Sequence, residues 1–105
     1  MHSYKILSES EITQALTLLP GWNLNGPKLH AHYIFKNFKE AINFMNEVVP
    51  ECEKLDHHPL WANSYNRVEI SLCTHAVGDK ITDYDVKLAT LICDVATKYG
   101  LNTSN

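Results

Sequence analysis

The stretch EKLDHHPLWANSY, residues 53–65, marks the place where a long helix gives way to a strand. Upstream of it, apolar residues recur at the three- and four-residue spacing of a helix with one buried face, and they are Ala41, Ile42, Phe44, Met45, Val48, Val49 and Cys52. Pro59 sets the latest end of this helix, because the residue before a proline avoids the helical region. Residues 60–65 and 67–74 are then predicted to form two short strands joined near Asn66.

The N-terminal part of the chain carries the signals of one helix and two strands. Ser8, with Glu11 three residues later, predicts the start of a helix through a reciprocal cap. Pro20-Gly21 ends that helix. Residues 22–24 and 29–35 follow as predicted strands, the second with the alternation of apolar and polar side chains that a half-buried strand shows.

The ends of the other two helices are also marked. Asn37 is predicted to cap the second helix, with Glu40 at the position that reaches back to the cap. Pro50 removes one backbone donor inside this helix, so we expect a kink or a restart there. Thr82 is predicted to cap the last helix, which Gly100 ends.

These elements predict an α+β fold. Their order is α-β-β-α-β-β-α, which three helices packed on one face of a four-stranded antiparallel sheet satisfy. The chain has 105 residues, and we therefore expect a single domain that spans residues 1–105.

Composition excludes several classes of function. The net charge is −3 and the nine lysine and arginine residues are scattered, so direct binding of nucleic acid, which needs clustered cations, is not expected. We expect no membrane span, which needs roughly 20 apolar residues, and no secretory signal. Three cysteines at wide spacing argue against a disulfide framework and for a reducing compartment, so we expect a cytoplasmic protein. They are interpreted as small core residues: Cys52, Cys73 and Cys93.

The opening stretch also concentrates imidazole and aromatic groups. If the helix runs through Glu53, then Glu53 and His57 lie one turn apart, where a carboxylate fixes the tautomer of an imidazole. His58, held extended by Pro59, points elsewhere, and His75 closes a predicted strand, so the rings are expected around one pocket. With the tryptophan and tyrosine of the stretch, this set suits a planar polar heterocycle that exchanges protons near neutral pH.

Other interpretations of these residues stay open at this point. Adjacent histidines at a helix end often form only local hydrogen bonds or face water. A three-histidine zinc site is a second functional interpretation, but neighbouring residues point apart and do not easily share one ion, so we predict a site without metal. The acidic residues Asp79, Asp83 and Asp85 lack the regular spacing of a calcium loop and are interpreted as helix-capping groups.

At these positions the sequence resembles the pterin-4a-carbinolamine dehydratases. The family pattern is an acidic or similar residue, three others, His-His/Asn-Pro, five others, an aromatic residue, nine others and a histidine, followed later by an aspartate. This chain matches it with Glu53, His57-His58-Pro59, Tyr65, His75 and Asp85. The resemblance extends over about residues 22–96. It departs in the loop after His75, which has one glycine where the family usually has a pair.

The resemblance implies the same fold in a homodimer or homotetramer. It implies a lyase that removes water from 4a-hydroxytetrahydrobiopterin to give quinonoid dihydropterin, without metal or organic cofactor, and so recycles the tetrahydrobiopterin of aromatic amino acid hydroxylases. In this interpretation His57 and His75 exchange protons with the substrate and His58 places the pterin. Glu53 orients His57, and Asp85 serves mainly as a helix cap. The expected pocket walls are Pro59, Trp61 and Thr74.

Two alternatives fit the same resemblance. A dehydratase that acts on another pterin, such as a molybdopterin-related compound, would present the same pocket residues. Animal members of the family also act as dimerisation partners of a homeodomain transcription factor, so a non-catalytic coactivator module is the other alternative. The complete set of one glutamate and three histidines favours the enzyme, because a binding module would not need it.

Overall fold

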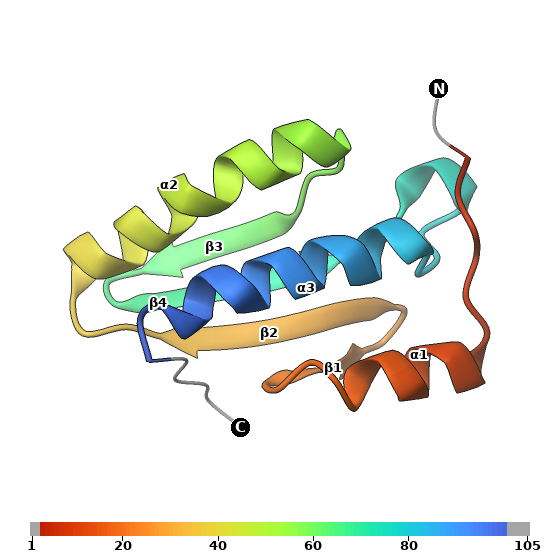
Figure 1. Cartoon of the computed structure of the whole chain (residues 1–105), viewed down its shortest axis with the longest axis horizontal. Coiled ribbons are helices and arrows are strands. Elements are labelled where there is room, and N and C mark those ends of the chain that lie inside the picture. The colour runs from red at the N-terminus through yellow and green to blue at the C-terminus, as the bar shows by residue number, and fades with distance from the viewer. Residues whose placement is uncertain (1–2, 101–105) are drawn as a thin grey trace.

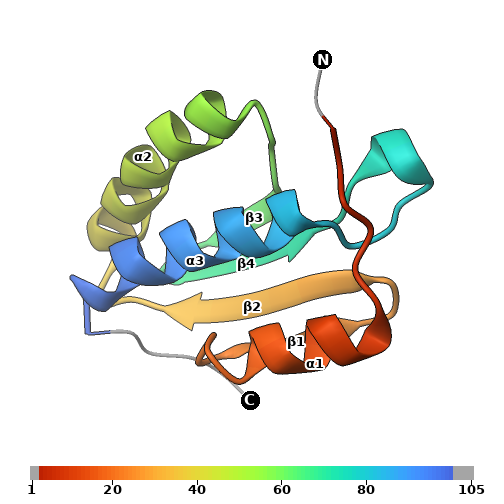
Figure 2. The same ribbon diagram turned by 45° about the vertical axis from the view of Figure 1, so that its right-hand side comes forward.

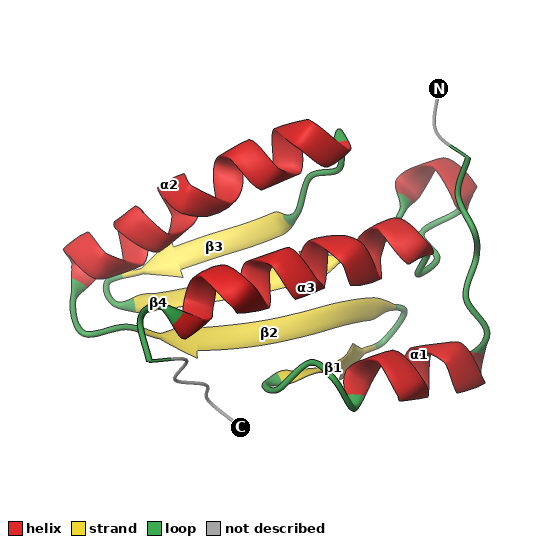
Figure 3. Cartoon of the chain, in the orientation of Figure 1, coloured by secondary structure: helices red, strands yellow, loops and turns green. Residues whose placement is uncertain are grey.

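The computed structural model describes residues 3–100, so the ends of the predicted domain, residues 1–2 and 101–105, lie outside the described residues. Within that range the elements are α1 (Glu9–Leu16), β1 (Trp22–Asn25), β2 (Lys28–Ile34), α2 (Phe38–Leu55), β3 (Leu60–Ser64), β4 (Arg67–Leu72), the short 3-10 helix η1 (His75–Val77) and α3 (Asp83–Thr97). Figure 3 colours them by type, and apart from η1 their order is the predicted one.

The four strands form one antiparallel sheet in the order β1-β2-β4-β3. Ile70 of β4 lies opposite Ala31 of β2 and opposite Trp61 of β3, so these three side chains share one face of the sheet. Figures 1 and 2 show that α1, α2 and α3 all cover one face of the sheet. The predicted α+β fold, with three helices on one side of a four-stranded sheet, is therefore confirmed.

The core lies between the two central strands and the helices. Alternate residues of β2 and β4 are buried, as their sequence pattern predicts, because successive side chains of a strand point to opposite faces. Helices α2 and α3 pack on each other and close the other side. The fully buried side chains include Leu29, Ala31, Tyr33, Phe44, Val48, Val68, Ile70, Leu88 and Ile92.

Reciprocal caps fix the starts of α1 and α3, and their cap residues, Ser8 and Thr82, are the predicted ones. The Ser8 hydroxyl accepts a hydrogen bond of 3.1 Å from the Glu11 backbone N–H, and the Glu11 carboxylate accepts one of 3.0 Å from the Ser8 backbone N–H. Thr82 and Asp85 form the corresponding pair at the start of α3. These bonds satisfy donors that have no partner inside the helix, and they hold an acidic side chain at its positive end.

Helix α2 is continuous through Pro50, so the restart considered for that position does not occur. Val48 and Cys52 are buried on either side of the proline, and this packing holds both parts of the helix against the core. The helix ends at Leu55, and the φ of 50° at the next residue, Asp56, lies in the left-handed region that terminates helices. That turn decides where the next two residues, the paired histidines, point.

Within residues 3–100, none of the helices combines the length and apolar character needed to cross a membrane. The three cysteines are free thiols and all are buried. Cys52 and Cys93 belong to the apolar core, whereas Cys73 is buried without being part of that cluster. All three are thus buried small residues, as predicted, and two of them lie in the connected core cluster.

Candidate active site

Three histidines line one cavity of about 210 Å³ beyond the ends of α2 and β4. The paired histidines follow the left-handed turn that ends α2, and His75 opens η1 directly after β4. The lining residues are Tyr4, Asp56, His57, His58, Cys73, Thr74, His75 and Ala76. The prediction that the three imidazoles stand around one pocket is thus confirmed.

His57 is held by a buried carboxylate from α3. Its Nε2 lies 2.6 Å from Oδ1 of Asp85, and the two side chains are 7% and 0% exposed. The other oxygen of Asp85 accepts hydrogen bonds of 2.8 Å from the Thr74 hydroxyl and from the Thr82 backbone N–H. An ionised carboxylate only accepts, so Nε2 of His57 donates, and in the neutral ring Nδ1 is the acceptor. Asp85 is therefore both a helix cap and the group that sets the tautomer of His57.

Glu53 pairs with His58, not with His57 as the helical spacing suggested. Because α2 ends at Leu55 and Asp56 is left-handed, His57 leaves the helix face and its backbone N–H returns to the Cys52 carbonyl at 3.0 Å. Nε2 of His58 lies 2.6 Å from Oε2 of Glu53, at side-chain exposures of 57% and 68%. This pair stands at the rim of the cavity, where water screens it.

His75 also has a carboxylate partner. Its Nδ1 is hydrogen-bonded to Oδ1 of Asp79, four residues along the same loop, and both side chains are exposed. The carboxylate accepts, so Nδ1 donates and Nε2 is the acceptor of the neutral ring. Each of the three imidazoles thus has one nitrogen engaged by its own carboxylate, from Asp85, Glu53 or Asp79.

Of the three residues predicted to line the pocket, one lines this cavity and two do not. Thr74 lines the cavity, and its hydroxyl is engaged with Asp85 and with the Thr82 hydroxyl, 2.8 Å away. Pro59 and Trp61 are not among the lining residues of this cavity. Trp61 instead packs partly buried against the core, because it lies opposite Ile70 on the helix-covered face of the sheet.

Tyr4 is a lining residue that the sequence pattern did not indicate. Its ring centroid lies 6.4 Å from that of His57 and 4.9 Å from that of Tyr84, edge-on to the latter. The N-terminal segment is held beside α3, because the Lys5 backbone N–H donates to the Asp83 carboxylate at 3.0 Å and a β-bridge follows at the next residue. Figure 1 shows this segment running past η1 and the start of α3. No local spacing reveals a contact between residues this far apart.

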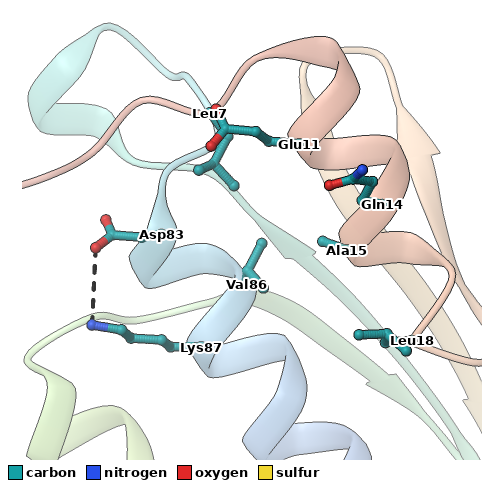
Figure 4. Close-up of a pocket in the computed structure, with 8 residues that line it drawn as sticks. All are labelled: Leu7, Glu11, Gln14, Ala15, Leu18, Asp83, Val86 and Lys87. Carbon is teal, nitrogen blue, oxygen red and sulfur yellow. Dashed lines mark ion pairs between the residues drawn. The ribbon is translucent and has the colours of Figure 1, made fainter.

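A larger hollow of about 410 Å³ lies between α1 and α3 and is mostly apolar (Figure 4). It has no histidine, and each of its charged side chains, Glu11, Asp83 and Lys87, already has an oppositely charged partner. Lys87 pairs with Asp83 at 3.9 Å across one helical turn. The Ser8 backbone N–H and the Lys5 ammonium lower the pKa of Glu11 to about 2. The smaller cavity with the histidines is therefore the better candidate for proton transfer near neutral pH.

Comparison with known proteins gives one consistent result. The family model described as pterin 4 alpha carbinolamine dehydratase matches residues 5–95. A relative from Sulfurisphaera tokodaii, named "Putative pterin-4-alpha-carbinolamine dehydratase", is 42% identical over 89% of this chain and 99% of its own length. One of the same name from Opitutus terrae is 45% identical over 80% of this chain and 87% of its own. A crystal structure described as a transcriptional coactivator/pterin dehydratase from Brucella melitensis superposes with a TM-score of 0.83 at 39% identity, and covers 88% of this chain and 99% of its own.

Proposed function

Because the chain belongs to the pterin-4a-carbinolamine dehydratase family, we propose that it removes water from 4a-hydroxytetrahydrobiopterin to give quinonoid dihydropterin. The observation that carries this proposal is the cavity lined by three histidines, each with its own carboxylate. Loss of the 4a hydroxyl needs a proton donor, and loss of the N5 proton needs an acceptor. Histidine serves both needs near neutral pH.

The reaction balances without a metal, an oxidant or a reductant. A general acid protonates the 4a hydroxyl, the C4a–O bond breaks and water leaves. A general base takes the N5 proton, and the electron pair of the broken N5–H bond forms the C4a=N5 double bond. His57 and His75 carry these two transfers, each contributing about 10² to 10⁴-fold, and His58 hydrogen-bonds the pterin and sets its position.

The carboxylates act through the imidazoles. Asp85, in place of Glu53, is the positioning residue for His57, because its oxygen lies at hydrogen-bond distance from Nε2 in a buried site. An anionic partner fixes the orientation of the ring and its tautomer, so Nδ1 of His57 is the acceptor in the neutral ring. Glu53 has the weaker, solvent-screened version of this role for His58.

Tyr4 supplies flat apolar surface on the wall of the same cavity. A pterin is a planar bicyclic ring, and aromatic side chains hold such rings by stacked or edge-on contacts. We therefore assign Tyr4 a role in substrate binding and none in proton transfer. This role replaces the one expected of Trp61, which packs against the core instead.

Two finer questions belong to this proposal. One is which pterin side chain the enzyme prefers, and the other is whether the protein also acts as a coactivator. The Brucella melitensis neighbour is described as a coactivator as well as a dehydratase, and a homodimer or homotetramer with a partner surface would serve both. The enzyme is the function favoured here, because a coactivator would not need three imidazoles oriented by three carboxylates. A functional link to an aromatic amino acid hydroxylase follows if the pterin is tetrahydrobiopterin.

A panel of 4a-hydroxytetrahydropterins with different side chains, each generated in situ, tests the proposal. Ultraviolet absorbance follows formation of the quinonoid product with and without the protein. We expect a rate above the spontaneous one for at least one pterin, highest for the tetrahydrobiopterin compound. Spontaneous rates with every pterin, from protein shown to be folded by circular dichroism, would overturn the enzymatic proposal and leave the coactivator role.

A further inference from the structure

Cys73, His75 and Asp79 bring three different metal-binding atoms together beside the cavity. A thiol sulfur, an imidazole nitrogen and a carboxylate oxygen from these residues all lie within 4.8 Å of one another. Cys73 is buried, but it lies outside the connected apolar cluster that contains Cys52 and Cys93. The proposed dehydration uses His75 and its partner Asp79 but has no step for the Cys73 thiol, so the mechanism does not account for the sulfur beside this pair.

The loop that carries these groups is closed on itself by backbone hydrogen bonds. Thr74 N–H donates to the Lys80 carbonyl at 2.8 Å, Asp79 N–H donates to the Thr74 carbonyl at 3.1 Å, and Gly78 N–H donates to the His75 carbonyl at 3.1 Å. The chain therefore places the three donor groups near one another before any cation arrives. Little further ordering is needed for binding, which favours affinity.

Charge and access also suit a cation. Burial raises the pKa of the Cys73 thiol, the charges of Asp79 and Asp85 raise it further, and Lys28 lowers it. The two carboxylates favour a cation beside the sulfur. The side chains of His75 and Asp79 are 84% and 57% exposed, so a hydrated ion reaches them from solvent. Binding of an ion would replace the hydrogen bond between Nδ1 of His75 and Oδ1 of Asp79.

We propose that Cys73, His75 and Asp79 bind one zinc ion. Thiolate, imidazole and carboxylate are the three ligand types that zinc takes in proteins, and three protein ligands leave a fourth tetrahedral position for water. The two adjacent histidines considered for zinc from the sequence are not part of this set. An ion here occupies the imidazole of His75 and therefore inhibits the dehydration, a consequence that rests on the proposed function.

Titration of the metal-free protein with cobalt(II) chloride, in the absence of pterin, tests the site itself. We expect one equivalent to bind with a thiolate-to-cobalt charge-transfer band, and zinc chloride to displace it. The band should vanish in Cys73→Ser and persist in Cys93→Ser, whose thiol lies in the core. Asp79→Asn keeps the backbone conformation, since asparagine tolerates the positive φ of 60°, and should weaken binding about 10-fold or more.

Circular dichroism of each variant separates loss of the site from loss of the fold. Absence of the band in the parent protein, or an unchanged band in Cys73→Ser and Asp79→Asn, would overturn the zinc site. A separate assay then measures dehydration with zinc chloride and after EDTA, where we expect reversible inhibition in the parent and none in Cys73→Ser. Cobalt binding without any dehydration would contradict the proposed function and leave the site standing. Dehydration without the charge-transfer band would contradict the zinc site and leave the proposed function standing.

Discussion

Nε2 of His57 lies 2.6 Å from Oδ1 of Asp85, in a pair of side chains almost wholly removed from water. The relationship joins the chain just after α2 to the first turn of α3. It makes Asp85 a structural and a functional residue at once, because the same carboxylate caps α3 and orients the imidazole. Two consequences, one for stability and one for turnover, are separable by experiment.

Asp85→Ala should destabilise the protein by about 1–3 kcal/mol or more, the usual cost of leaving a buried polar group without its hydrogen-bond partner. Its removal leaves His57 and the Thr82 N–H without their acceptor. Asp94→Ala, on the exposed side of the same helix, is the matched control and should change stability by no more than about 0.5 kcal/mol. Urea unfolding measures both, and equal midpoints for the two variants would contradict the role given to Asp85.

Glu53→Gln should have a small effect on stability, below about 1 kcal/mol, because the pair that Glu53 forms with His58 is exposed to water. A double-mutant cycle with His58→Ala measures the coupling directly. The hydrogen bond between His57 and Asp85 should be unchanged in this variant, as seen by the imidazole resonances of His57. A shift of those resonances as large as that in Asp85→Asn would support the pairing first expected from the helical spacing.

Tyr4→Ala should raise KM roughly 2- to 10-fold, the range of about 0.5–1.5 kcal/mol for an aromatic contact, with kcat little changed. Tyr4→Phe keeps the ring and should behave like the parent. Tyr65→Ala removes an exposed tyrosine at the β3–β4 turn and serves as the control. A fall in kcat at constant KM for Tyr4→Ala would argue against a purely binding role.

Glu11 predicts a pH dependence of stability in the acid range. Its pKa falls from 4.5 to about 2 in the folded chain, chiefly through the hydrogen bond from the Ser8 backbone N–H and then through Lys5. A carboxyl with a depressed pKa stabilises the fold above its ordinary pKa, and that contribution disappears as the pH falls from about 4.5 to about 2. Glu11→Gln should therefore unfold more easily than the parent at neutral pH.

The gap between Glu11→Gln and the parent should close as the pH is lowered through that range. Glu9→Gln changes a neighbouring carboxyl in the same first turn and should show no such convergence. Urea midpoints at a series of pH values measure both. A constant gap for Glu11→Gln would mean that the carboxyl is not ionised preferentially in the folded state.

Local patterns predicted most of the fold and the grouping of His57, His58 and His75, but not the carboxylate partners of His57 and His58. Caps at Ser8 and Thr82 and the alternation in β2 and β4 depend on neighbours in the sequence. The partner of His57 depended on where α2 ends. Because Asp56 adopts a left-handed conformation, a shift of one or two residues at the helix end decided which histidine faces inward.

Local sequence patterns did not predict the position of Tyr4 or the partner of His75. Tyr4 reaches the cavity only because a β-bridge between Ile6 and Thr82 holds the N-terminal segment beside α3. The pairing of His75 with Asp79 depends on η1, a turn that the strand pattern does not indicate. The first contact follows from the tertiary structure, and the second from the local turn that follows β4.

The most direct test of the central claim measures the rate of 4a-hydroxytetrahydrobiopterin dehydration by the parent, His75→Ala and His30→Ala proteins. His75 is exposed, so its replacement should leave the fold intact, and His30 lies on β2, outside the cavity. We expect the parent and His30→Ala to react well above the spontaneous rate. For His75→Ala we expect kcat to fall by about 10²-fold or more. Equal rates for the parent and His75→Ala would contradict proton transfer by this histidine.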